Sequence, residues 1–122
     1  MKFTRQFDQM DCGPACIRMV AAHYGKDYPL SYLRSLSHLT REGVSVAGIR
    51  DALHEIGAES VTFEMTLQQL REVCPLPAIL HWEQNHFVVL YGVRKERFSG
   101  KWKYEVANPA FGKSALSEET FS

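Results

Sequence analysis

The spacing of apolar residues changes along this chain, and that change is the strongest constraint on its fold. Up to residue 73 apolar side chains recur mostly at helical spacing, and beyond it they form short strand-like runs. Helices that precede consecutive strands joined by short turns are typical of an α+β fold with an antiparallel sheet. We therefore predict N-terminal helices packed on an antiparallel sheet, in a single domain that covers residues 1–122.

Capping residues and turn residues set the expected bounds of the elements. Helices are predicted over 12–24, 31–37, 46–56 after a Ser45 cap, and 67–73 after a Thr66 capping box. Residues 60–64 alternate between apolar and polar, which predicts a strand. Three further strands are predicted over 78–82, 86–91 and 102–107 as an antiparallel meander, and a new helix is expected to begin at Ser117.

The run Asp11-Cys12-Gly13-Pro14 predicts the start of a helix. Proline favours the first helical turn, where its missing N–H costs nothing, and Gly25 is expected to end this helix in the left-handed region. The N–H groups that lack partners inside the helix converge on Cys12, together with the positive end of the helix dipole. This location predicts a lowered pKa for the Cys12 thiol and hence a nucleophilic thiolate.

A thiolate nucleophile needs a base, and the base needs a group that orients it. His86 opens the most apolar strand, so we predict it as the base. Pro109 restricts Asn108 to extended backbone, which predicts the Asn108 amide at the end of the neighbouring strand. Its oxygen is expected to accept the imidazole Nδ1–H. A Cys–His–Asn set is the papain-like form of the nucleophilic triad.

The other cysteines are interpreted as structural. Cys16 lies one turn after Cys12 on the apolar face, Cys74 lies in an apolar stretch, and both are predicted in the core. Three cysteines is an odd number, which favours reduced thiols in a cytosolic setting. A zinc site can be drawn from Cys12, Cys16, His81 and His86. Its Cys-x3-Cys spacing on a helix is poor for structural zinc, so no metal is predicted.

Charge and hydropathy argue against several other classes of protein. The 14 basic residues are balanced by 14 acidic ones, so the composition predicts no basic surface for binding nucleic acid. No apolar run is long enough to span a bilayer, and the N-terminus lacks the apolar run of a signal peptide. The glycines form no phosphate-binding loop, and no cofactor is predicted.

The motifs together resemble the C39 family of cysteine peptidases. The matching residues are Gln6, 11–16, 19–20, 24–25, 41–45, 86–90 and 108–109, and they span nearly the whole chain. Members of this family are N-terminal cytosolic domains of ABC transporters that export bacteriocins and related peptides. The resemblance implies a papain-like fold and cleavage of leader peptides after a double glycine, coupled to export.

The resemblance also implies roles for individual residues. Cys12 would be the nucleophile, His86 the base and Asn108 the orienting residue, with the Gln6 side chain and the Cys12 backbone N–H forming the oxyanion hole. The family more often has aspartate where this chain has Asn108, and an amide gives an imidazolium less electrostatic support. Trp82 and Phe87 are candidate walls of a slot for glycine because they lie near His86 in the sequence.

The implied partners are a leader-bearing precursor peptide and the transmembrane and ATP-binding domains of an ABC transporter, without nucleic acid. The implied location is the cytoplasmic face of the bacterial plasma membrane, as a segment of a longer transporter that is soluble when isolated. A second function stays open, namely a module that binds leader peptides without cutting them, as degenerate relatives do. Those relatives lack the cysteine, so Cys12 favours the enzyme.

Overall fold

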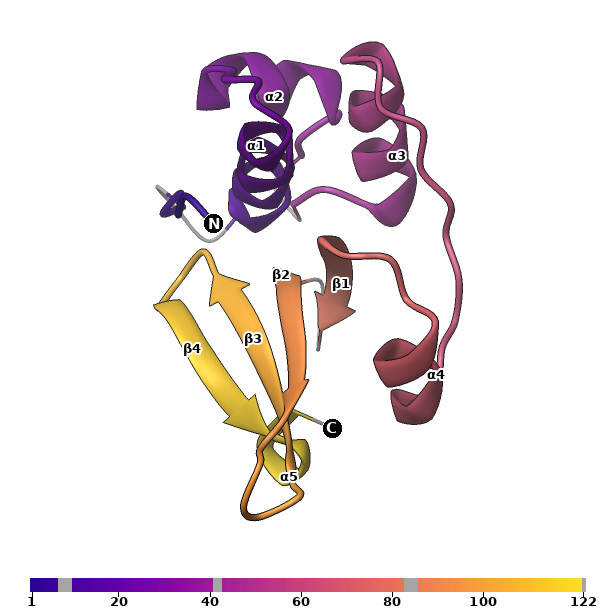
Figure 1. Cartoon of the computed structure of the whole chain (residues 1–122). Coiled ribbons are helices and arrows are strands. Elements are labelled where there is room, and N and C mark those ends of the chain that lie inside the picture. Colours follow the sequence, from indigo (N-terminus) through magenta and orange to yellow (C-terminus); the bar gives the residue numbers. More distant parts are fainter. Residues whose placement is uncertain (7–9, 41–42, 83–85, 122) are drawn as a thin grey trace.

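The computed structural model describes residues 1–6, 10–40, 43–82 and 86–121, and the first three helices form a layer above an antiparallel sheet (Figure 1). The helices are α1 (Cys12–His23), α2 (Leu30–Leu36), α3 (Val46–Glu55), α4 (Leu67–Glu72) and α5 (Glu118–Phe121). The strands are β1 (Ala78–Trp82), β2 (His86–Lys95), β3 (Trp102–Asn108) and β4 (Gly112–Ser117). They pair in the order β1-β2-β3-β4, every pair antiparallel.

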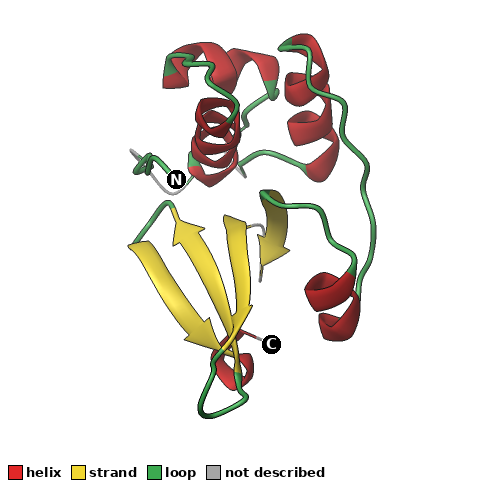
Figure 2. Ribbon diagram, in the orientation of Figure 1, coloured by secondary structure: helices red, strands yellow, loops and turns green. Residues whose placement is uncertain are grey.

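The predicted α+β architecture is confirmed, and most elements begin and end close to their predicted bounds (Figure 2). The predicted caps are also present. The Ser45 side chain accepts the Gly48 N–H at 3.0 Å, and Thr66 and Gln69 form the two reciprocal hydrogen bonds of a capping box. Gly25 has the positive φ expected of a residue that ends a helix, +82°.

One predicted strand is absent, and one observed strand was not predicted. Residues 60–64 form an extended connection between α3 and α4, because alternation alone does not supply a neighbouring strand for pairing. Val61 and Phe63 in this connection are exposed. Conversely, β4 was not predicted, because it is an edge strand with three exposed residues in a row and shows no apolar alternation. It forms because it pairs along β3, from Asn108 opposite Gly112 to Lys103 opposite Ser117.

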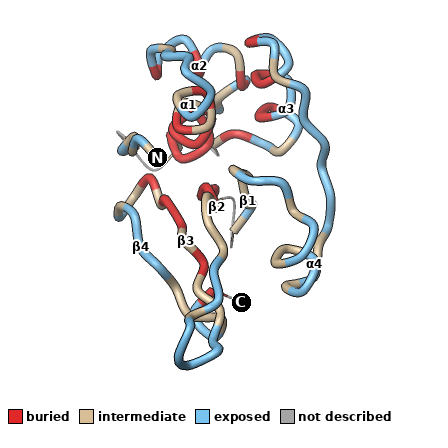
Figure 3. The backbone as a smooth tube through the Cα atoms, viewed as in Figure 1, coloured by how far each residue is buried: buried red, intermediate tan, exposed pale blue. Residues whose placement is uncertain are grey.

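Helix α1 is the central element of the core (Figure 3). Its first turn is buried throughout, and it packs against β2 on one side and against α2 and α3 on the other. The first core cluster joins residues such as Ile17 and Met19 of α1 to Phe87 and Val89 of β2. This packing brings the N-terminal turn of α1 against the end of the sheet at which β2 begins.

The opposite face of the sheet has its own core cluster. Val88, Leu90 and Tyr104 are fully buried there, and the Tyr104 ring stacks on Phe121 of α5 with 4.3 Å between centroids. Both faces of β2 are therefore covered, which explains why residues 87–90 are an unbroken apolar run. No helix among the described residues has the length and apolar character needed to cross a membrane.

Candidate active site

His86 and Asn108 meet where β2 begins and β3 ends, at the end of the sheet nearest α1 (Figure 1). His86 Nε2 lies 2.8 Å from Asn108 Oδ1, and the same oxygen accepts the Ala110 N–H at 3.0 Å. A backbone N–H can only donate, so the shared atom is the amide oxygen and His86 Nε2 carries the proton. The sequence-based expectation that Nδ1–H makes this contact was wrong, since residue order does not determine which way a ring points.

This contact leaves His86 Nδ1 as the ring nitrogen for a second partner. In the neutral ring with a proton on Nε2, Nδ1 is an acceptor. Asn108 therefore selects the tautomer in which Nδ1 can take a proton from another group. That is the state a general base needs before it can deprotonate a thiol.

Cys12 lies next to this pair. Its Sγ accepts the backbone N–H of Phe87 at 3.4 Å, and Phe87 directly follows His86 in β2. The cysteine is at the start of α1 as predicted, but it is also buried, with an exposed fraction of 3%. The structure thus brings together the predicted nucleophile, base and orienting residue at the junction of α1, β2 and β3.

The predicted lowering of the Cys12 pKa was wrong. Burial raises the pKa of the Cys12 thiol, and the N–H groups of Phe87 and Gly13 lower it only in part, while the charge of Asp11 raises it further. The helix start supplies N–H donors as expected, but the loss of hydration outweighs them. A positive charge nearby would favour the thiolate at this position.

Gln6 is connected to the histidine–asparagine pair through one peptide group. The Gln6 N–H donates to the Pro109 carbonyl oxygen at 3.1 Å, and the N–H of that same peptide group, on Ala110, donates to Asn108 Oδ1. The neighbouring Arg5 adds a hydrogen bond from Nη1 to the Ala110 oxygen at 3.1 Å. These bonds hold the N-terminal segment against the β3–β4 turn, and sequence reasoning offered no signal for them.

The two candidate substrate-binding residues differ in their surroundings. Phe87 is 2% exposed, and its ring stacks on His81 with 4.7 Å between centroids. Such a side chain offers a peptide almost no surface, which argues against Phe87 as a wall of a binding slot. Trp82 lies directly opposite His86 in the β1–β2 pair, is half-buried and packs near Phe121.

The remaining cysteines separate into one core residue and one loop residue. Cys16 is fully buried in the first cluster as predicted, and burial raises the pKa of its thiol well above the ordinary value. Cys74 was predicted in the core but is half-buried between α4 and β1, outside both clusters, because the chain leaves α4 just before Pro75. Within the described ranges no three potential metal ligands lie close enough together to hold an ion.

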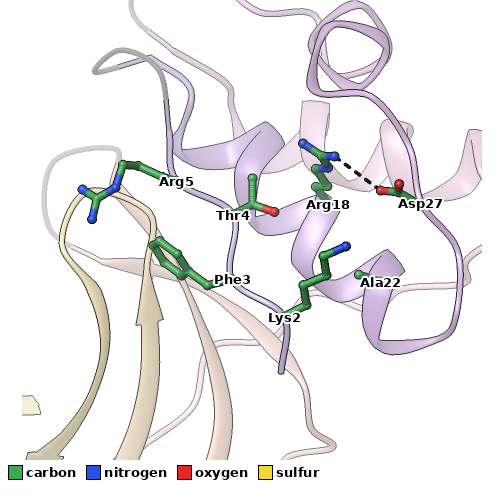
Figure 4. Close-up of a pocket in the computed structure, with 7 residues that line it drawn as sticks. All are labelled: Lys2, Phe3, Thr4, Arg5, Arg18, Ala22 and Asp27. Carbon is green, nitrogen blue, oxygen red and sulfur yellow. Dashed lines mark hydrogen bonds and ion pairs between the residues drawn. The ribbon is translucent and has the colours of Figure 1, made fainter.

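A shallow pocket between the N-terminal segment and α1 lies apart from this site (Figure 4). Its lining includes Lys2, Arg5 and Arg18, and the Arg18 guanidinium lies 3.5 Å from a carboxylate oxygen of Asp27. None of Cys12, His86 and Asn108 lines it. The pocket therefore does not add to the chemistry of the candidate site.

An α+β domain with a cysteine at the start of its core helix and a histidine–asparagine pair on adjacent strands has the architecture of the papain-like class. The model of the Peptidase C39 family matches residues 1–122, and the chain belongs to this family.

Relatives in the same family are longer proteins with secretion and processing roles in their names. The chain is 36% identical over 117 residues to the colicin V secretion/processing ATP-binding protein CvaB of Escherichia coli, covering 96% of this chain and 16% of that protein. It is 33% identical over 126 residues to the lactococcin-G-processing and transport ATP-binding protein LagD of Lactococcus lactis subsp. lactis, covering 99% of this chain and 17% of that one.

Solved structures share the fold. A double glycine motif protease from an AMS/PCAT transporter, in complex with the leader peptide, superposes with a TM-score of 0.88 at 31% identity, over 98% of this chain and 81% of the other. The peptidase domain of Streptococcus ComA, described as a bifunctional ABC transporter of a quorum-sensing pathway, superposes with a TM-score of 0.84 at 27% identity, over 98% and 88%. The fold is therefore that of C39 peptidase domains.

Proposed function

We propose that this chain is the peptidase domain of an exporter and cuts leader peptides from precursor peptides after a double glycine. The observation that carries the proposal is the His86–Asn108 contact beside Cys12, in a chain of the C39 family. The whole of residues 1–122 would act as one peptidase domain. No metal or cofactor enters the reaction that we propose.

The proposed reaction begins with transfer of the Cys12 proton to His86 Nδ1. The sulfur electron pair then attacks the scissile carbonyl carbon, and the C=O π electrons move onto oxygen, where the Gln6 side-chain N–H and the Cys12 backbone N–H stabilise the charge. His86 returns the proton to the leaving amine as the C–N bond breaks. Water, deprotonated by His86, attacks the thioester carbon, and the C–S bond breaks to release the leader with a new C-terminal carboxyl group. His86 returns the proton to the Cys12 sulfur. Asn108 holds the imidazole in place throughout.

The proposed substrate class rests on the relatives. One structural neighbour is a double glycine motif protease in complex with a leader peptide, and curated relatives are processing and transport proteins. Glycine offers no side chain to grip, so selection would come from a slot too narrow for larger residues. Affinity would come from the leader upstream of the cut, whose binding energy positions the scissile bond.

The proposed partners follow from the same relatives. The chain spans 16–17% of the length of CvaB and LagD, whose names describe ATP-binding transport and processing proteins. We propose that it works beside the transmembrane and ATP-binding domains of an ABC transporter, at the cytoplasmic face of the membrane. There it would meet the precursor before export.

The test of the proposed function is cleavage of a precursor that carries a full leader ending in Gly-Gly. We expect mass spectrometry to locate one cut directly after the second glycine. A matched precursor with Val-Val in place of Gly-Gly should stay intact, and a peptide cut down to the few residues around Gly-Gly should react far more slowly. Tight binding of the leader without any cleavage would instead support the binding module.

Substitution of Asn108 should separate its orienting role from the reaction itself. We expect Asn108→Asp to keep or raise kcat, because a carboxylate still accepts the His86 Nε2–H and the Ala110 N–H and adds a charge that stabilises imidazolium. Asn108→Ala should lower kcat by roughly tenfold to a hundredfold, the scale of a misplaced catalytic group.

The pH–rate profile of kcat/KM provides the measurement for Asn108. The basic limb of the Asn108→Asp profile should lie at higher pH than that of the parent, because the added negative charge favours the protonated ring. An Asn108→Ala enzyme with an unchanged rate and an unchanged profile would leave only a Cys12–His86 dyad.

A further inference from the structure

A partly buried ion pair lies directly beside the proposed nucleophile. Asp11 precedes Cys12 and is fully buried, and Arg34 of α2 reaches it from another helix. Arg34 Nε lies 2.7 Å from Asp11 Oδ1, and Nη2 lies 2.6 Å from Oδ2. Two parallel N–H···O bonds of this kind make the strongest and most directional pairing of arginine with a carboxylate.

Asp11 does not perform the usual task of an aspartate at a helix start. Asp11 occupies the N-cap position of α1, where an aspartate side chain ordinarily accepts an N–H from the second or third helical residue. The third residue is Pro14, which has no N–H, so Gly13 is the one available donor at these two positions. The Asp11 side chain makes no capping hydrogen bond. The Gly13 N–H instead acts on the Cys12 thiol, whose pKa it lowers.

We propose that Arg34 is a positioning residue for the reaction. By holding the Asp11 carboxylate in a two-point ion pair, it keeps that carboxylate away from the first N–H groups of α1. Those groups then remain available to the Cys12 sulfur and to the oxyanion. This inference rests on the proposed role of Cys12 as the nucleophile.

The charges around Cys12 support this role for Arg34. The Asp11 charge raises the pKa of the Cys12 thiol, and a cation paired with that carboxylate opposes the effect. The other titratable and charged groups on α1 and on the elements packed against it, α3 apart, are Cys16, Arg18 and His23 on α1, Tyr32 on α2, His81 on β1, and His86, Tyr91, Arg94 and Lys95 on β2. The charged and titratable residues of α3 are all exposed, namely Arg50, Asp51, His54 and Glu55.

Helix α2 is held firmly enough to present Arg34 in one place. Leu33 is fully buried against α1, and the Ser37 hydroxyl donates to the Leu33 carbonyl oxygen at 2.7 Å. The next helix approaches so closely that a Cβ on Gly48 would collide with the Ser37 carbonyl oxygen. The guanidinium therefore projects toward Asp11 from a packed helix and not from a loop.

Four variants test the proposal, two of which form a charge-removal pair. Arg34→Met leaves the Asp11 carboxylate without its cation, whereas the double variant Asp11→Leu/Arg34→Met removes both charges with side chains of similar shape. Arg34→Lys keeps the charge but loses the two-point geometry. Arg18→Met is the matched control, because Arg18 is as exposed as Arg34, 34% against 32%, and pairs with the exposed Asp27.

Two readouts are needed for each variant. The first is kcat and KM on a full leader precursor, and the second is the pH dependence of Cys12 alkylation by iodoacetamide, followed by mass spectrometry of the Cys12 peptide. We expect Arg34→Met to lower kcat roughly tenfold to a hundredfold with little change in KM. Its alkylation midpoint should move to higher pH. The double variant should recover most of both losses, Arg34→Lys should lie between, and Arg18→Met should match the parent.

The proposal is overturned if Arg34→Met keeps the kcat and the alkylation profile of the parent, or if the double variant is as impaired as Arg34→Met. The second result would mean that the ion pair only supports the local structure and that its charges do not act on Cys12. If circular dichroism shows that Arg34→Met does not fold, Arg34→Lys and the double variant carry the same comparison. A parent chain that cuts no leader would refute the proposed function, while its alkylation profiles would still decide whether Arg34 positions Cys12.

Discussion

Cys12→Ala is expected to abolish leader cleavage while the chain stays folded and still binds the leader. Alanine has no group that can attack the scissile carbonyl, so no thioester can form. The substitution also removes the acceptor of the buried Phe87 N–H, which should lower the free energy of unfolding by about 1–3 kcal/mol. Single-turnover assays, thermal melts and leader-binding titrations would separate these effects.

Cys16→Ala is the matched control, since it removes a second buried thiol from the same helix one turn away. We expect it to keep kcat and to lose stability of about 1 kcal/mol or somewhat more, from the small cavity that it leaves. Turnover by Cys12→Ala comparable to that of the parent would show that Cys12 is not the nucleophile. Loss of turnover in Cys16→Ala but not in Cys12→Ala would identify Cys16 as the nucleophile.

Gln6→Ala is expected to lower kcat by roughly a hundredfold or more, the usual cost of losing one oxyanion donor. KM should change little, because the hydrogen bond strengthens only as charge develops on the oxygen. The substitution isolates the side chain, since the Gln6 backbone N–H would still donate to the Pro109 oxygen and the His86–Asn108 pair would keep its support.

Gln6→Glu is a sharper companion to this variant. It preserves the size of the side chain but replaces an N–H donor by a negative charge, so it should be at least as inactive as Gln6→Ala. Steady-state kinetics on a full leader precursor would measure both. A rise in KM with unchanged kcat in Gln6→Ala would make Gln6 a substrate-binding residue and leave the oxyanion to backbone donors.

Local signals in the sequence predicted most of the secondary structure. The Ser45 and Thr66 caps are hydrogen bonds between residues only three positions apart. They depend on the local helix start and not on distant parts of the chain. The strand prediction at 60–64 and the missed β4 show the limit of such signals. A strand exists only if a partner strand lies beside it, and residues far along the chain decide that.

The sequence by itself determined the candidate residues, the α+β fold class and the family. Patterns of nearby residues carry that information, as in the helix start around Cys12 and the strand that begins at His86. The tertiary structure alone decided that His86 presents Nε2 to Asn108, and that burial raises the pKa of the Cys12 thiol.

Contacts between distant segments were likewise decided only by the tertiary structure. Arg34 and Asp11 are 23 residues apart, and Arg5 and Ala110 are 105 residues apart. Hydration, hydrogen-bond partners and charge depend on the side chains that surround a group in space. Those neighbours are set by how α1, α2 and the sheet pack together, and no local pattern in the chain records that packing.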